Sequence, residues 1–304
     1  MTAQPMTAPA TGTGDSPQGL AFAVSAYLMW GVLPLYLKLM SHLSPFEVVA
    51  HRIVWSVPLA GALLIVLGRT GDVRRALVHP RTLAQGALTA ALITVNWGVY
   101  IWAINSGHTL DAALGYYINP LFSVFLGAVL LREKLGRAQI AALSLAAMAV
   151  VILAVENGRM PWLSLLLTFS WGFYAFFKKS LPIGPNQGFL LEVLILLPPA
   201  LGYILYLGVN GGGHFGGFDQ STLLLLGCGV VTAIPLIIYA NGAKLLRLST
   251  IGILQYITPT MVFLVAVFLF GEPVGRGQIL AFPLIWLALV IYTGALIQQS
   301  RRRG

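Results

Sequence analysis

The sequence predicts an all-α polytopic membrane protein, with ten transmembrane helices arranged as two inverted five-helix repeats. Three observations support this prediction: a strongly apolar composition, recurring long apolar runs and an internal repeat. Hydrophobic residues make up 58% of the chain and charged residues 9%, whereas a soluble protein carries about 25% charged residues. The apolar runs reach about 18 residues or more, so each can cross a hydrocarbon core of about 30 Å as a helix.

Apolar runs mark the predicted spans along the chain. They cover residues 18–38, 46–68, 82–105, 110–131, 138–155, 161–181, 188–208, 221–241, 250–271 and 277–297. The connections are short except for the Arg-rich loop 69–81 and for 209–220, which we predict to be a flexible Gly-rich turn and not a soluble domain. Residues 1–17 are rich in Thr, Ala, Pro and Gly and lack Lys and Arg, so they predict a disordered cytoplasmic tail and not a signal peptide.

Lys and Arg are distributed unequally between the two sets of connections. One set, together with the C-terminal tail, holds Arg69, Arg74, Arg75, Arg81, Arg132, Lys134, Arg137, Lys178, Lys179, Lys244, Arg247, Arg301, Arg302 and Arg303. The alternate set holds only Lys38, Arg159 and Arg276. Since cytoplasmic loops are enriched in Lys and Arg, we expect both termini in the cytoplasm of a bacterial cell, with the chain in the inner membrane. The net charge of +9 then reflects orientation and not nucleic-acid binding, for which no basic stripe or stacking module is present.

An internal repeat relates residues 113–153 to residues 252–292 without a gap. The aligned identities include Tyr117/Tyr256, Pro120/Pro259, Glu133/Glu272, Gly136/Gly275, Arg137/Arg276 and Gln139/Gln278. The N-terminal parts align less cleanly, with Trp30 matching Trp171 and Pro58 matching Pro198. We therefore predict a first repeat over 18–155, a second over 161–297 and a basic cytoplasmic tail over 298–304.

The second repeat must enter the membrane from the opposite side, because five helices are an odd number. The charges agree, since the Arg-rich connection 69–81 corresponds to 209–220, which contains no Lys or Arg. Two halves of like fold and opposite direction can adopt two mirror arrangements around a central site. This is the geometry of alternating access, and it favours transport over a purely structural role.

Ordered aromatic, Asn and Pro positions inside the predicted spans form recognisable motifs. They are SAYLMWG at 25–31, AHRIVWS at 50–56, NWGVYIWAIN at 96–105, LGYYINP at 114–120, TAIPL at 232–236, LQYITP at 254–259 and GEP at 271–273. With these motifs the chain resembles the drug/metabolite transporter superfamily in its ten-helix EamA-type form, and RarD-type permeases in particular, from about residue 19 to residue 297. The resemblance implies a secondary carrier of the inner membrane. The chloramphenicol-sensitivity name given to RarD-type proteins is weak guidance to the substrate.

Three ionisable residues near the outer end of the second span are the first candidates for a substrate or proton pathway. Glu47 and His51 are spaced i,i+4 and so share a helix face, and Arg52 lies next to that face. A charge at the bilayer centre costs about 2.5–3.5 kcal/mol, so such residues usually face protein or water. His51 or Glu47 could exchange protons with a gradient while Arg52 holds an anionic group of the substrate. The alternative is a structural ion cluster at headgroup level.

Aromatic and amide residues of three other spans form the second set of candidates. They are Asn96, Trp97, Tyr100, Tyr117, Asn119, Gln255, Tyr256 and Thr258. Such residues suit an apolar pocket with a few fixed polar contacts. Those paired by the repeat are expected near the central axis, and ordinary packing is the alternative for each.

Prolines paired by the repeat are candidates for helix kinks. They are Pro58, Pro120, Pro198 and Pro259. Proline removes a helical hydrogen bond and bends the helix, so symmetric kinks could let helix halves tilt around a site. A fixed bend required for packing is the alternative.

Acidic residues near helix ends have simpler expected roles. We expect Asp111 to cap the fourth span, Glu192 to form a salt bridge with the nearby Lys178 or Lys179 or to contact a lipid headgroup, and Glu133 and Glu272 to cap helices or fix loops.

The signatures of enzymes and nucleotide-driven pumps are missing from the sequence. Without a GxxxxGK[ST] P-loop, we expect no ATP hydrolysis by this chain. No DDxxD or GxSxG motif supports an enzyme, and the single cysteine, Cys228, cannot form an internal disulfide or a zinc cluster. We therefore expect no catalytic residues, no metal and no cofactor.

The expected partners are a small-molecule substrate and the lipid bilayer. Metabolites, amino acids and drug-like molecules all fit residues of mixed polarity. The sequence leaves open import against export, coupling to protons and formation of a homodimer. The alternatives to a secondary transporter are a sensor or assembly subunit without flux and, less favoured, a membrane-embedded transferase.

Overall fold

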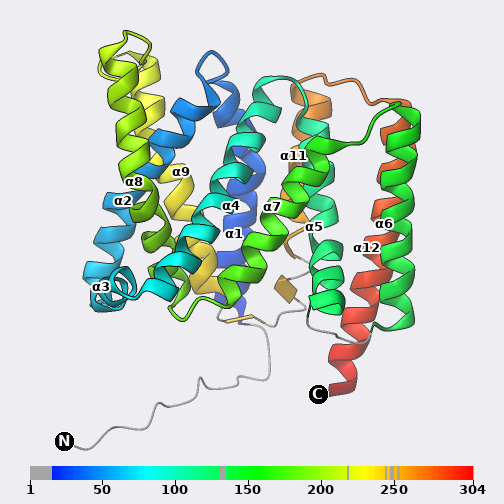
Figure 1. The fold of residues 1–304 in the computed structure, drawn as a ribbon. Helices are drawn as coiled ribbons and strands as arrows, with labels where there is room; N and C mark the ends of the chain where they lie inside the picture. The colour runs from blue at the N-terminus through cyan, green and yellow to red at the C-terminus, as the bar shows by residue number, and fades with distance from the viewer. Residues whose placement is uncertain are drawn as a thin grey trace, which may run out of the picture.

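Every regular element that the structure describes is a helix (Figure 1). The computed structural model describes residues 16–130, 135–217, 219–243, 245–246, 250–251 and 254–303. The elements are α1 (Pro17–Lys38), α2 (Pro45–Val66), α3 (Thr70–Val78), α4 (Pro80–Asn105), α5 (Thr109–Leu130), α6 (Arg137–Glu156), α7 (Trp162–Lys179), α8 (Pro185–Val209), α9 (Gln220–Ala243), α11 (Ile257–Leu264), the π-helical turn η1 (Val265–Leu269) and α12 (Arg276–Arg303).

Several predicted features fall outside this part of the chain. Residues 1–15 of the predicted tail 1–17 lie outside the described residues. Glu133 and four basic residues also lie outside them: Arg132, Lys134, Lys244 and Arg247. At the other end, α12 continues to Arg303, so the segment 298–304, predicted as a tail, is helical as far as the structure describes it.

Eight helices among the described residues are long and apolar enough to cross a membrane. They are α1, α2, α4, α5, α6, α8, the Gln220–Tyr239 part of α9 and the Arg276–Ala295 part of α12. The predicted sixth span coincides with α7, and the apolar helix found among the described residues of the ninth is shorter, Ile257–Leu269. The chain is thus a multi-pass membrane protein, while the prediction of ten spans in two inverted repeats stays a prediction.

Proline starts four of these helices and interrupts others. Pro17, Pro45, Pro80 and Pro185 stand at the first positions of α1, α2, α4 and α8, where the missing N–H would have no helical partner anyway. Of the kink candidates, Pro58, Pro120 and Pro198 lie inside α2, α5 and α8. Pro259 is the third residue of α11, so it lies in a first turn, where proline is tolerated.

The connection 69–81 is not a simple loop, because it contains α3. Val73 and Ala76 bury one side of this nine-residue helix. Asp72 accepts a hydrogen bond from Arg75 at 2.8 Å and another from Gln187 of α8 at 3.2 Å. The bond to Gln187 holds α3 against the start of α8, at the end of the bundle where α1 begins and α12 ends, the lower end in Figure 1.

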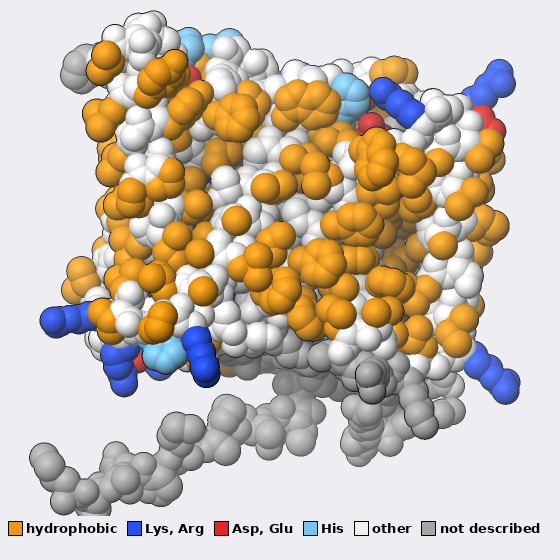
Figure 2. Space-filling model, viewed as in Figure 1, with side chains coloured by type: hydrophobic (Ala, Val, Ile, Leu, Met, Phe, Trp, Pro, Cys, Tyr) orange, Lys and Arg blue, Asp and Glu red, His pale blue; other side chains and the backbone are white. Residues whose placement is uncertain are grey.

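The outer surface matches a bilayer environment. Figure 2 shows hydrophobic side chains across the middle of one face and Lys and Arg side chains at its upper and lower edges. Large apolar side chains such as Ile65, Phe268 and Val290 are at least 68% exposed. In hydrocarbon this exposure carries no penalty, because lipid tails are as apolar as these side chains, and the helices satisfy their own backbone hydrogen bonds.

Packing divides the bundle into two apolar cores. One involves α1, α2, α4, α7, α8 and α9, and the other α5, α6, α11, η1 and α12. α5 lies between them, since it also packs closely against α7. Gly115 permits this close approach, because a Cβ there would lie 2.7 Å from the carbonyl oxygen of Ser164 in α7.

We predict that Gly115→Ala lowers the melting temperature of the purified protein by several degrees. Overpacking costs about 1–3 kcal/mol, and the backbone of α7 cannot move aside as a side chain can. The matched control is Gly98→Ala in α4, where a Cβ meets no atom within 4 Å; it should hold or raise the melting temperature, since Ala favours helix over Gly. Equal melting temperatures for Gly115→Ala and the unmodified protein would contradict the close packing of α5 on α7.

Candidate functional site

A central cavity of about 730 Å³ lies between the helices. Its lining residues come from α1, α2, α4, α5, α7, α8, α9 and α11. It extends from the middle of the bundle, at Arg52 and Tyr100, to the connection between α7 and α8 at Leu181 and Ile183. The cavity therefore reaches the lower end of the bundle in Figure 1.

Arg52 brings a positive charge to the wall of this cavity. The side chain is buried, and its Nε donates a hydrogen bond to Thr232 Oγ1 of α9 at 3.0 Å. Its guanidinium carbon lies 4.5 Å from the ring centre of Trp97 in α4, a cation–π arrangement. Nη1 has no hydrogen-bond partner among the described residues. None of the residues lining the cavity is Asp or Glu, so no carboxylate of the wall balances this charge.

Asn96 is a polar junction of three helices next to Arg52. Its Nδ2 donates to Leu167 O at 3.2 Å and to Ser170 Oγ at 3.0 Å, both in α7. Its Oδ1 accepts a hydrogen bond of 3.0 Å from Tyr116 OH in α5. The amide is thus occupied by the protein itself, and its role is to hold Tyr116 in the cavity wall.

Aromatic side chains form two groups in the cavity wall. In the α1–α9 aromatic cluster, Tyr27, Trp30 and Tyr239 have ring centres 5.5–5.7 Å apart. In the α5–α7 aromatic cluster, defined by Tyr116, Trp171 and Tyr174, consecutive rings are 6.3 and 5.6 Å apart. Sequence reasoning did not select these six residues. The repeat match between Trp30 and Trp171 was the signal that could have found two of them, because both line the cavity.

The second basic residue of the wall, Lys178, is paired. Its Nζ lies 2.7 Å from the Oε1 atom of Glu192 in α8, and Tyr174 OH donates to the other carboxylate oxygen at 3.3 Å. This confirms the expected Lys178–Glu192 pair. It also leaves Arg52 as the basic side chain of the cavity wall that has no carboxylate partner.

Contacts between distant segments close the bundle at the end opposite the cavity mouth. Glu272 accepts hydrogen bonds of 2.9 Å from the backbone N–H groups of Thr109 and Leu110, and Lys38 Nζ donates to Ile104 O at 3.2 Å. Glu272 thus caps α5, as expected for a loop acid. Asp111 lies in the first turn of α5, as expected, but its side chain accepts a hydrogen bond from Gln278 at 3.0 Å. The expectation that Asp111 caps the helix by hydrogen bonding is therefore corrected, because Glu272 of a distant loop accepts the bonds from the first amides.

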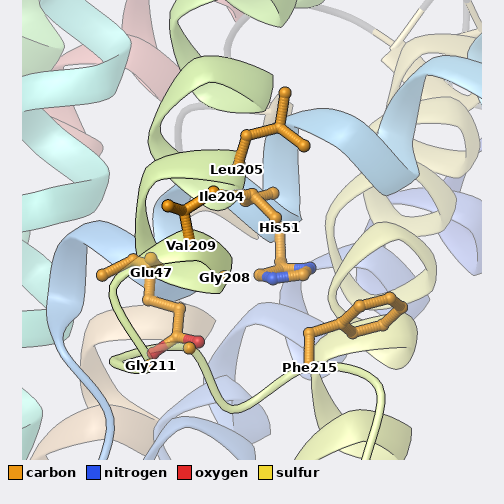
Figure 3. Close-up of a pocket in the computed structure, with 10 residues that line it drawn as sticks. Glu47, His51, Ile204, Leu205, Gly208, Val209, Gly211 and Phe215 are labelled. Atoms are coloured by element: carbon orange, nitrogen blue, oxygen red, sulfur yellow. The ribbon is translucent and has the colours of Figure 1, made fainter.

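Glu47 and His51 line a different, smaller cavity of about 370 Å³ at this upper end (Figure 3). Glu47 accepts hydrogen bonds from the backbone N–H and the Nδ1 of His214, at 2.8 and 2.9 Å. His51 Nδ1 accepts a bond of 3.1 Å from Trp55, and its ring lies 4.9 Å from the Phe215 ring. The two residues share a face as expected, but the structure separates them from the cavity that Arg52 lines.

The remaining candidates divide between the central cavity and the apolar cores. Trp97, Tyr100, Asn119, Gln255 and Thr258 line the cavity along with Arg52 and Asn96. Tyr117 points elsewhere: its hydroxyl shares a hydrogen bond of 2.8 Å with Thr260, and its ring packs on Phe282. Tyr256 packs against the same core. The expectation that both tyrosines face the central axis is therefore not met.

The described residues offer no grouping of three or more His, Cys, Asp or Glu side chains that could hold a metal ion. The cavity wall offers groups suited to binding: the unpaired Arg52, the paired Lys178, several hydroxyl and amide groups, and large aromatic faces.

Comparisons with known proteins agree with this arrangement. Residues 17–155 match the EamA-like transporter family. Protein RarD of Streptomyces exfoliatus is 42% identical over 93% of this chain and 90% of the relative. The uncharacterized transporter YojE of Bacillus subtilis is 40% identical over 94% and 97%, and Protein RarD of Escherichia coli K12 is 36% identical over 94% and 97%. A solved crystal structure with 19% identity aligns over 90% of this chain and 96% of its own with a TM-score of 0.59, which shows a shared fold.

The matching family and the names of these relatives indicate a multi-pass membrane transporter for a small molecule rather than an enzyme. The chain belongs to the EamA-like transporter family, among the RarD-like permeases of the drug/metabolite transporter superfamily.

We predict that Asn96→Leu destabilises the protein while Asn119→Leu does not. The first change leaves Tyr116 OH and the Ser170 hydroxyl without their amide partner, at a cost of about 1–3 kcal/mol. Asn119 is a matched control, because it also lines the cavity but its Oδ1 has no partner among the described residues. The measurement is the melting temperature in detergent, and equal losses in the two variants would show that Asn96 is not a structural junction.

Proposed function

We propose that this protein is a secondary transporter of a bacterial inner membrane, which moves a small molecule through the central cavity by alternating access. The observation that carries the proposal is the form of the cavity. It reaches the lower end of the bundle, while Glu272 and Lys38 contact α5 and α4 across the upper end. A central cavity that reaches one end of the bundle while contacts close the other end is expected of a carrier that is open to a single side of the membrane.

The contacts between helices support the inverted repeat that alternating access requires. If α1, α2, α4, α5 and α6 correspond to α7, α8, α9, α11 and α12, every major contact has a counterpart. The contact α1–α9 matches α7–α4, α1–α11 matches α7–α5, and α2–α9 matches α8–α4, while α2–α8 and α6–α12 match themselves. On this basis we assign α7 to the sixth span and α11 with η1 to the ninth.

A repeated hydrogen bond supports the same correspondence. Gly136 N donates to Gln139 Oε1 at 2.8 Å before α6, and Gly275 N donates to Gln278 Oε1 at 3.0 Å before α12. Both residues of each pair are matched by the sequence repeat, so the two halves begin their last helix in the same way.

The distribution of charge supports an orientation with the cavity mouth in the cytoplasm. Arg69, Arg74, Arg75 and Arg81 belong to α3 and its flanks at the lower end, where the chain also ends (Figure 1). By the positive-inside tendency this end is cytoplasmic. The described conformation is then the inward-open one. Glu47 and His51 lie at the closed upper end of the bundle, where Glu47 holds the loop at His214. We propose that they contribute to proton coupling through this closed end and not through the central cavity.

Transport is tested by efflux from proteoliposomes loaded with a pooled panel of amino acids, metabolites and drug-like molecules, with and without a pH gradient. We predict loss of one class of compound, and its arrest by Ala175→Trp, because Ala175 lines the cavity and an indole there blocks the path. Ala147→Trp is the matched control, since Ala147 is an exposed residue of α6 that does not line the cavity. Absence of flux from folded protein would favour a sensor or assembly subunit.

We predict that Glu272→Gln shifts the protein toward the outward-open conformation. A hydrogen bond to a charged group contributes about 1.5–3 kcal/mol, so weakening the two bonds to α5 should raise the outward-open fraction severalfold. The measurement is labelling of Leu33→Cys, a cavity position, by an impermeant maleimide added from outside, in a Cys228→Ala background. Glu156→Gln, which changes an exposed acid, should leave the labelling rate unaltered. No acceleration in Glu272→Gln would contradict a closing role for the Glu272 contacts.

A further inference from the structure

We propose that the transported molecule is a small organic anion, with one carboxylate bound by Arg52 and a flat unsaturated ring, and without a cationic group. The inference rests on the transport function proposed above and names its substrate class. Three observations carry it: an unbalanced buried cation, the geometry of that cation and the aromatic walls around it.

The charge of Arg52 calls for an anion that the cavity wall does not supply. Its side chain is only 4% exposed, and the protein engages it through Thr232 and Trp97, neither of which is anionic. Glu47 lies five residues earlier on the same helix, but its carboxylate is held by His214 in the other cavity. An unpaired charge away from water costs several kcal/mol. A bound anion removes that cost, so binding energy is available to an anion and not to a neutral or cationic ligand.

The geometry of Arg52 favours a carboxylate. A guanidinium offers planar, parallel N–H donors that match the two oxygens of a carboxylate. Thr232 occupies Nε, while Nη1 has no partner among the described residues. The contact with Trp97 and the hydrogen bond to Thr232 hold the guanidinium at two points, so its position is set before the ligand arrives.

The walls favour a flat ring on that carboxylate. Trp97 and Tyr100 lie beside Arg52, and the α1–α9 and α5–α7 aromatic clusters line the cavity. Aromatic faces bind other rings in offset or edge-on contacts worth about 0.5–1.5 kcal/mol each beyond simple burial. Asn119 Oδ1 is a buried acceptor without a partner among the described residues, and it suits an uncharged hydroxyl or N–H group on the ring.

An ammonium group finds no carboxylate on these walls. Lys178, the other basic side chain of the lining, adds positive charge, and Glu192, its partner, is not part of the lining. Aromatic faces do attract cations, so a zwitterionic aromatic amino acid is the closest rival. Chloride or acetate would satisfy Arg52 but would leave the aromatic walls unused.

The test compares compounds that share a phenol ring and differ in charge. They are 4-hydroxybenzoate as the anion, tyrosine as the zwitterion, 4-hydroxybenzamide as the neutral amide and tyramine as the cation, with acetate and chloride as anions that lack a ring. Binding to the purified full-length protein is measured by calorimetry, and flux by proteoliposomes. We predict that 4-hydroxybenzoate binds at least about tenfold more tightly than each of the others, the equivalent of about 1.4 kcal/mol.

The variants Arg52→Gln, Arg52→Lys and Arg276→Gln assign the effect to one side chain. Arg52→Gln should weaken binding of the anion by about tenfold to a hundredfold, as expected for loss of a charged hydrogen-bonding partner. The binding affinity of 4-hydroxybenzamide should change little. The anion preference is therefore measured as the ratio of the affinities for 4-hydroxybenzoate and 4-hydroxybenzamide within one variant, and this ratio does not depend on the stability of the variant. Arg52→Lys should retain part of the preference, because it keeps the charge but not the planar donors. Arg276→Gln, which changes an exposed arginine, should change nothing.

Each outcome decides the matter. An anion preference that disappears in Arg52→Gln supports the proposal. Tighter binding of tyrosine or tyramine than of 4-hydroxybenzoate would overturn it. An anion preference that survives Arg52→Gln would also overturn it, as would binding of acetate or chloride with the same affinity as 4-hydroxybenzoate. Flux of another compound class without an anion preference would overturn the inference and leave transport standing, whereas anion binding at Arg52 without any flux would overturn transport and leave the anion site standing.

Discussion

Hydrocarbon gives a polar group no partner, so each one inside this bundle has to be satisfied by the protein or by a ligand. Most are satisfied by the protein. Asn96 joins three helices through hydrogen bonds of its amide, and Glu192 pairs with Lys178 and accepts a hydrogen bond from Tyr174. Against this background the unsatisfied groups carry information. Arg52 Nη1 and Asn119 Oδ1 have no partner among the described residues, and both side chains line the same cavity, so it is there that a ligand would complete the polar interior.

The same constraint explains how the two ends of the bundle differ. At the upper end, polar groups bond between distant segments: the Glu272 carboxylate accepts hydrogen bonds from the free backbone amides of α5, across the two proposed halves, and Lys38 of α1 donates to Ile104 O in the last turn of α4, within the first half. A helix N-terminus attracts a carboxylate through its unpaired N–H groups and its dipole. These bonds are long-range in sequence and few in number, and exposed water could replace each one. They can therefore hold one conformation of the carrier without making it permanent.

The helices could be predicted from sequence because the signal is local: apolar runs, prolines at helix starts and the charge of connections. Partners could not. An i,i+4 spacing places Glu47 and His51 on one face, and one residue further, a rotation of about 100°, turns Arg52 toward a different cavity. Spacing alone does not say which face meets which cavity. Asp111 had the right position to cap α5, but Glu272 arrives from the other half of the chain. The short helix α3 was missed because only Val73 and Ala76 mark its buried side.

The position of Arg52 on α2 connects binding to closure. A ligand shifts a conformational equilibrium only through contacts that differ between the two states. Arg52 contacts α4 through Trp97 and α9 through Thr232, so an anion bound there acts on helices of both proposed halves. Five residues earlier, the same helix carries Glu47, whose carboxylate holds the loop at His214 in the upper closure. An α-helix segment of this length transmits a tilt or a shift with little loss. In the proposed cycle, α2 therefore links the charge state of the cavity to the contact that closes the opposite end, and an empty site with an unbalanced Arg52 differs mechanically from a filled one.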